Sequence, residues 1–244
     1  MSALALKISN MDEKCQKCLQ MAYSEVLSQV TKLNRHSKPV FAQISLWKLI
    51  DKTIGDALAE TGATIACKAG CSYCCYLKVD VHASEAILIS EFVKSKLPEE
   101  TKKLIIKRAE ENWKLIEPMN EVQHMTTNLP CPFLVDGICS IYSVRPGACR
   151  NFHSADVQIC KDFFNNPKNL NDNRIIAQET YQRSSLVIQG GIQAFKKCEY
   201  DIHAYDINAA FLEAINNKHI ANRWSDKKNA LSKNARSKSD HLDK

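Results

Sequence analysis

Cys67-Lys-Ala-Gly-Cys71-Ser-Tyr-Cys74-Cys75 places four cysteines within nine residues of a chain of 244. A short loop with two residues between cysteines lets their sulfurs converge on one ion, whereas a regular helix or strand does not aim so many sulfurs at one point. Gly70 stands directly before Cys71 and is expected to supply backbone with a positive φ. We therefore predict a metal-binding loop here, and not a set of buried, inert thiols.

A second group of cysteines follows further along the chain. It starts with Cys131-Pro-Phe-Leu-Val-Asp-Gly-Ile-Cys139 and continues to Cys149 and Cys160. Gly137, like Gly70, is expected at positive φ. The two groups together supply eight thiols, which suit two four-sulfur sites or one cluster with spare thiols. Tetrahedral sulfur coordination serves zinc and iron alike, so the pattern predicts Zn²⁺ or Fe, the latter as an ion or as a 4Fe–4S cluster.

Basic side chains flank these cysteines. Four thiolates around Zn²⁺ carry a net charge of −2, which is costly to bury without compensation. Arg145 and Arg150 can donate hydrogen bonds to sulfur or neutralise it, and an ordinary salt-bridge role remains equally open for both. Lys68 is better interpreted as a surface residue. His153 is a candidate ligand or a donor to a ligand, although packing or capping is the favoured interpretation.

Several features of the chain predict a cytoplasmic protein. Met1 to Met11 contains one lysine and no long apolar run, which is unlike a secretory signal. No stretch approaches the roughly 18 apolar residues of a membrane span. Disulfides are rare in reducing compartments, so the odd number of 11 cysteines indicates metal binding or redox chemistry. The remaining cysteines, Cys15, Cys18 and Cys198, are expected to be ordinary buried thiols.

The fold is predicted to be mainly α, with helices enclosing two irregular cysteine-rich metal-binding loops. Only 7 Gly and 7 Pro argue against a Rossmann fold or a TIM barrel. Apolar spacing predicts helices over 11–33 and 41–60, with Gly62 as a stop, a helix from the N-cap Ser84 to Leu97, and another opened by Pro98. A last helical region is expected from residue 175, interrupted at Gly190-Gly191.

Four segments follow from this pattern. They are an N-terminal helical segment (1–62), a cysteine-cluster metal-binding domain (63–165), C-terminal helices packing on it (166–222) and a basic disordered tail (223–244). The net charge is +6, and seven Lys/Arg lie between Arg223 and Lys244. A solvated terminus explains this charge better than a nucleic-acid-binding arm, because nothing here resembles a basic face interleaved with aromatic residues. The expected partner is a metal ion, with no membrane and no nucleic acid.

The two cysteine segments resemble the YkgJ/CxxCxxCC family of zinc- or iron-chelating domains. The motifs are CKAGCSYCC, followed by CPFLVDGICSIYSVRPGACRNFHSADVQIC, so the resemblance covers Cys67 to Cys160. It implies a ligand set drawn from Cys67, Cys71, Cys74, Cys75, Cys131, Cys139, Cys149 and Cys160. It brings no reaction with it, and the expected function is zinc or iron binding with the cellular role unassigned.

Two other functional classes stay open beside this one. The first is an iron–sulfur redox or modification enzyme, and the second is a zinc-stabilised module that binds protein or nucleic acid. The spacing of Cys67, Cys71 and Cys74, with Tyr73, also fits the three-cysteine pattern of radical SAM enzymes. That scheme leaves Cys75 and the second group without a role, and the sequence lacks its alternating strands and helices, so we reject it. An open coordination position, or a pocket beside the metal lined by Arg145 and His153, would favour an enzyme, whereas a closed four-sulfur site would favour a structural role.

Overall fold

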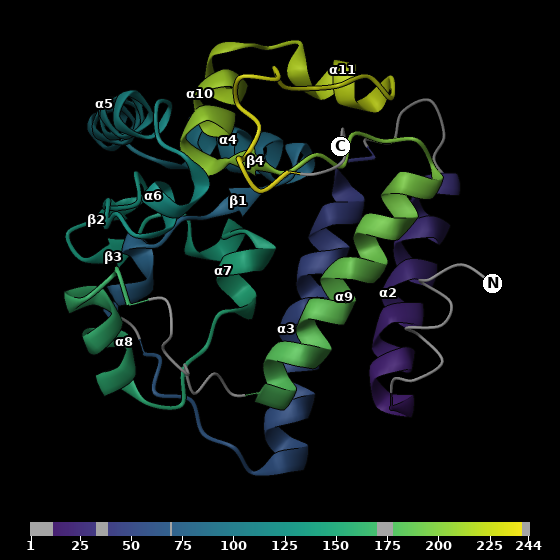
Figure 1. The fold of residues 1–244 in the computed structure, drawn as a ribbon. Helices are drawn as coiled ribbons and strands as arrows, with labels where there is room; N and C mark the ends of the chain where they lie inside the picture. The colour runs from purple at the N-terminus through teal and green to yellow at the C-terminus, as the bar shows by residue number, and fades with distance from the viewer. Residues whose placement is uncertain (1–11, 33–38, 69, 170–177, 241–244) are drawn as a thin grey trace.

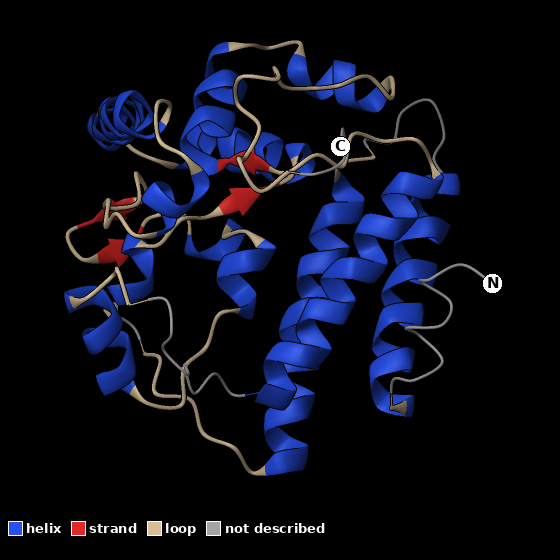
Figure 2. Cartoon of the chain, viewed as in Figure 1, coloured by secondary structure: helices blue, strands red, loops and turns tan. Residues whose placement is uncertain are grey.

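The computed structural model describes residues 12–32, 39–68, 70–169 and 178–240. The architecture is mainly α, as expected from the sequence, and Figure 2 shows helices joined by irregular segments with a few short strands. Within these residues no helix is both long enough and apolar enough to cross a membrane. The elements fall into a group of long helices on one side and the cysteine-bearing segments on the other (Figure 1).

Three long helices pack side by side (Figure 1). They are α2 (Glu13–Thr31), α3 (Phe41–Thr61) and α9 (Gln178–Lys197). Gly62 ends α3 with φ of 65°, and its N–H donates to the Leu58 carbonyl, as expected for a glycine C-cap. The helix predicted over 41–60 is thus confirmed, and the one over 11–33 agrees with α2 over its described part.

Helix α9 runs without a break through Gly190 and Gly191, so the expected interruption is wrong. A Cβ atom at Gly190 would lie 2.3 Å from the backbone oxygen of Leu19 in α2. A Cβ atom at Gly191 would lie 2.4 Å from Cδ2 of Leu46 in α3. The glycine pair therefore serves close helix packing, which outweighs the low helix propensity of glycine.

A second helical group covers the other end of the molecule. It contains α4 (Ala83–Lys96), α5 (Glu99–Ile116), α6 (Glu121–Met125), α10 (Ile207–Asn216) and α11 (Ile220–Ser225). The N-cap of α4 is His82 and not Ser84, because the Glu85 side chain accepts a hydrogen bond from the His82 N–H at 3.0 Å. Ser84 is buried instead, and its hydroxyl donates to Gln43 Oε1. Pro98 precedes α5, as expected.

The cysteine-bearing segments are built from short elements. The 3-10 helices are η1 (Tyr73–Tyr76) and η2 (Tyr142–Val144), and the α-helices are α7 (Gly147–Asn151) and α8 (Val157–Asn165). Strand β1 (Asp80–Val81) pairs antiparallel with β4 (Tyr205–Asp206), and β2 (Leu134–Val135) pairs with β3 (Ile138–Cys139). The β1–β4 pair joins the cysteine-bearing part to the C-terminal helices.

The expected disordered tail is wrong for residues 223–240. Trp224 is fully buried, and its Nε1 donates to the Asp201 carbonyl at 3.1 Å. Ala230, Leu231 and Ala235 are also buried, and the Ala235 carbonyl accepts from the Asp206 N–H at 3.0 Å. A few apolar residues at irregular spacing thus dock an otherwise charged segment. Residues 241–244 lie outside the described part.

Candidate metal centre

Main-chain hydrogen bonds hold the two cysteine loops against each other. The N–H of Cys131 donates to the carbonyl of Cys75 at 2.7 Å. Upstream, the N–H of Ala66 donates to the carbonyl of Ser154 at 2.8 Å. Segments separated in sequence are therefore adjacent in the fold, as a shared metal site requires.

Local backbone geometry turns the first loop inward. Gly70 has φ of 84°, the positive value expected before Cys71. The N–H of Cys71 then donates to the Lys68 carbonyl at 3.0 Å, and the N–H of Cys75 donates to the Ser72 carbonyl at 2.9 Å. These tight turns put consecutive cysteines on a compact, irregular stretch of backbone.

A hairpin brings Cys131 and Cys139 together. Leu134 pairs with Cys139 across β2 and β3, and Asp136 and Gly137 at the turn have φ of 51° and 75°. Positive φ at both central residues is typical of a two-residue hairpin turn. The hairpin therefore holds Cys139 beside the strand that follows Cys131.

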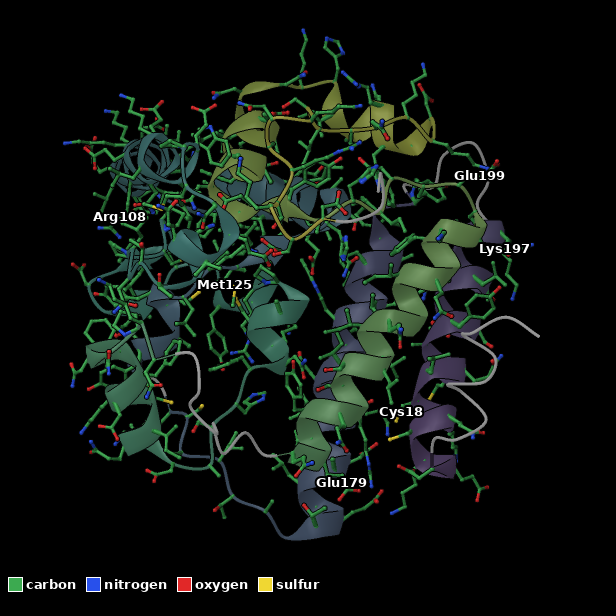
Figure 3. The ribbon with its side chains drawn as sticks, in the orientation of Figure 1. Cys18, Arg108, Met125, Glu179, Lys197 and Glu199 are labelled. Atoms are coloured by element: carbon green, nitrogen blue, oxygen red, sulfur yellow. The ribbon has the colours of Figure 1, made fainter. Side chains whose placement is uncertain are left out.

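Helix α5 holds the first arm of this hairpin, on either side of Cys131. Arg108, labelled on α5 in Figure 3, donates to the Leu134 carbonyl. Asn112 Nδ2 donates to the Pro130 carbonyl at 2.9 Å. Phe133 is fully buried and meets Phe211 of α10 edge to face, with ring centroids 5.0 Å apart. The second loop is thus anchored to the helical core.

Six of the eight candidate ligands line one cavity of about 950 Å³: Cys71, Cys74, Cys75, Cys131, Cys139 and Cys149. Cys160 lies on α8, which packs on η1 through Phe164 against Tyr73 and Tyr76. Cys160 lines a smaller cavity of about 20 Å³ together with Cys74. Cys74 therefore stands between the two spaces. Cys67 lines neither, but it is close enough to Cys71 and Cys74 for their charges to raise its pKa.

The protein environment raises the pKa of six of these cysteines. Burial raises the pKa of Cys67, Cys131, Cys139, Cys149 and Cys160. For Cys74 a hydrogen bond with the Cys75 side chain raises the pKa most, and burial adds to it. Metal ligands must be thiolates, so a cation bound here would replace protons.

The thiols are neighbours without forming a finished coordination shell. Among the residues that the structure describes, no group of three or more His, Cys, Asp or Glu side chains is arranged to hold a metal ion as it stands. The donor set itself fits zinc and iron, since both take thiolate ligands.

Arg145 lines the cavity together with the thiols. Its guanidinium stacks over the Tyr142 ring at 4.2 Å, and its buried Nε has no hydrogen-bond partner among the described residues. The pKa of Cys139 and of Cys149 is raised by burial, and that of Cys74 by its hydrogen bond with Cys75 and by burial. The charge of Arg145 acts in the opposite direction on all three and is the smaller effect. It is placed to stabilise negative charge on sulfur.

Arg150 and His153 line neither cavity. Arg150 is buried, stacks over Trp47 and forms an ion pair with Asp51 of α3. It also donates to the Arg145 carbonyl at 2.9 Å, so its hydrogen bonds go to oxygen atoms. His153 is buried, and its Nδ1 lacks a hydrogen-bond partner within the part of the chain that the structure describes. Burial, and then the charge of Arg145, lowers its pKa.

Glu85 is a cavity residue that sequence reasoning missed. Its side chain is buried, and Oε1 accepts from Trp47 Nε1 at 3.1 Å and from the Gly147 N–H at 2.8 Å. A glutamate in the first turn of a helix is a recognisable capping signal. Its contacts with α3 and α7 are made to segments far away in the sequence, so the residues around Glu85 do not predict them.

The remaining cysteines lie away from the cavity. Cys15 and Cys18 are buried on α2, and Figure 3 labels Cys18 on the α2–α9 side of the molecule. Burial raises the pKa of Cys15 to about 11. Cys198 is half-buried just after α9.

Residues 66–181 match the family model CxxCxxCC, described as "Putative zinc- or iron-chelating domain". This stretch of the chain is therefore similar to the CxxCxxCC family, and it contains both cysteine loops. No curated protein and no solved structure matches the chain.

Proposed function

We propose that this protein is a cytoplasmic metal-binding protein whose centre is formed by the cysteines of both loops, with Cys74 at its middle. One observation carries the proposal: cysteines from two distant segments line a single cavity, and the Cys131–Cys75 main-chain hydrogen bond holds those segments together. The ligands are drawn from the eight cysteines between Cys67 and Cys160. The metal is zinc, or iron as an ion or a 4Fe–4S cluster.

Binding closes the thiols around the ion. Sulfur–zinc bonds are about 2.3 Å long, so the side chains must rotate toward one point as they lose their protons. The irregular backbone of 70–76 and the hairpin turn at 136–137 permit this adjustment while the anchored Phe133 keeps the second loop in place. Arg145 compensates the negative charge of the loaded centre.

A second candidate function is an iron–sulfur redox or modification enzyme. The observation that favours it is the size of the cavity, which at about 950 Å³ exceeds what a metal centre needs and leaves room for another molecule beside the thiols.

Anaerobic purification, metal analysis and an absorption spectrum test the proposal. We expect about one or two equivalents of zinc, or iron with a broad visible band if a cluster is present. Cys74→Ser and Cys131→Ser should lower the metal content, whereas Cys198→Ser should leave it unchanged. A protein that folds and binds neither metal would overturn the proposal, as would loss of metal in Cys198→Ser with retention in Cys74→Ser.

A further inference from the structure

The cavity beside the cysteines has two unlike sides. Opposite the thiols it is lined by apolar residues of the long helices: Leu46 and Ile50 on α3, and Ile188, Ile192 and Phe195 on α9. Figure 1 shows α3 and α9 running together on one side of the molecule, with α7 and α8 on the other. Small-molecule sites typically have volumes of about 300–1,000 Å³, mostly apolar walls and a few polar groups. This cavity has that character.

Most polar groups on the wall already bind protein atoms. Ser84 donates to Gln43 at 2.9 Å, and Glu85 accepts from three N–H groups. Lys78 forms an ion pair with Asp80. These groups fix the wall and are not available to a ligand without breaking existing hydrogen bonds.

Arg145 differs from these groups. Within the described part of the chain its guanidinium forms no ion pair, and its buried Nε has no hydrogen-bond partner. An arginine offers five N–H donors in a planar fork, enough to face sulfur on one edge and a carboxylate on another. A ligand carboxylate that pairs with the part of the guanidinium that lines the cavity would gain affinity from charge-assisted hydrogen bonds.

Three of the apolar side chains that line the cavity are exposed. Ile138 and Tyr142 are each 62% exposed, and Met125, labelled in Figure 3, is 39% exposed; all three line the cavity. Large apolar side chains gathered at an opening mark a path for an apolar molecule.

We infer that the cavity binds a small organic monocarboxylate with an apolar body. Its carboxylate pairs with Arg145, and its body lies against the α3–α9 wall. The inference rests on the proposed function in one respect, since it assigns the thiol side of the same cavity to the metal. It adds the chemical class of the second occupant.

Calorimetric titration of the metal-loaded protein with octanoate, octanol and octylamine tests this. Octanoate should bind about tenfold more tightly than octanol, and octylamine should bind no better than octanol. Arg145→Gln should remove the preference for octanoate and leave octanol affinity unchanged. Ile192→Trp should fill the apolar side and weaken both, whereas Leu115→Trp, at an exposed site on α5, should weaken neither.

Metal content is measured in parallel for every variant. Equal affinity for octanoate and octanol, or no binding of either by a fully metal-loaded protein, overturns the inference and leaves the proposed function standing. Octanoate binding that depends on Arg145 in a protein that holds no metal supports the ligand site and overturns the metal centre. Octanoate binding that survives Ile192→Trp places the ligand elsewhere and also overturns the inference.

Discussion

The carboxylate of Glu85 accepts a hydrogen bond from the N–H of Gly147 at 2.8 Å, across 62 residues of sequence. The same side chain binds Trp47 of α3 and caps its own helix. One buried group thus connects α3, α4 and the start of α7, which carries Cys149 two residues further on.

Replacing Glu85 should loosen this connection. In Glu85→Gln an amide NH₂ takes the place of one accepting oxygen and faces N–H donors, which leaves buried donors unsatisfied. We expect a loss of about 1–3 kcal/mol in the free energy of unfolding, measured by urea denaturation. Glu110→Gln on the exposed face of α5 is the control and should change little. Equal stability of the two variants would show that Glu85 is not a structural connection.

The glycine pair in α9 gives a graded prediction. Gly190→Ala should be strongly destabilising, because its new methyl group meets the backbone oxygen of Leu19, which cannot move alone. Gly191→Ala should cost less, since it meets the end of the Leu46 side chain. Gly55→Ala in α3 is the control: nothing lies within 4 Å, so helix propensity should stabilise it by about 0.5–1 kcal/mol. The order is read from melting temperatures, and a reversed order for the two α9 variants would contradict the packing.

The C-terminal segment should contribute to stability. Truncation after Ser225 removes the buried Ala230, Leu231 and Ala235, so the melting temperature should fall clearly. Leu231→Ala isolates one contact and should cost about 2 kcal/mol. Lys233→Ala, at an exposed neighbour, should be nearly neutral. An unchanged melting temperature after truncation would restore the interpretation of a disordered tail.

His124 should make the fold sensitive to mild acid. Burial lowers its pKa from 6.5 to about 4, so the unfolded chain binds a proton at a higher pH than the folded chain does. Stability from this group is therefore complete above pH 6.5 and is lost as the pH falls toward 4. A pKa shift of this size corresponds to about 3 kcal/mol in the free energy of unfolding. We expect a loss of roughly 2 kcal/mol, because Asp206 Oδ2 lies 3.7 Å from His124 Nε2 and attracts the protonated ring.

The measurement is the free energy of unfolding by urea at several pH values between 4 and 7. His124→Gln cannot titrate, so its profile over this range should be flatter than that of the unsubstituted protein. Parallel profiles would mean that His124 titrates normally in the folded state.

The cysteine motifs and the helices with regular apolar spacing could be predicted from the sequence. Positive φ at Gly70 and Gly137 was predictable too, because both effects are local in the chain. The cap at His82, the continuity of α9 and the docking of 223–240 were not predictable. Each depends on a partner far away, such as Leu19 for Gly190 or Asp201 for Trp224, and tertiary packing overrides local propensity there.

The candidate site also has a part that the sequence predicts and a part that only the fold determines. Spacing alone indicates that the two groups of cysteines bind metal, and the family match agrees. Spacing does not separate Arg145, which lines the cavity, from Arg150, which binds Asp51 outside it. The two arginines differ in their surroundings, and only the fold determines those.

Phe133 stands between Cys131 and Cys139, and its ring is enclosed by the core beside Phe211. Moving this hairpin outward would expose a whole aromatic ring, at a cost of about 3–5 kcal/mol. The two cysteines are therefore tied to the slow, cooperative opening of the core and not to the rapid fluctuations of a surface loop. A metal that enters the cavity would therefore meet two thiols whose main chain is already held in place, so less ordering is left to be done when the centre forms.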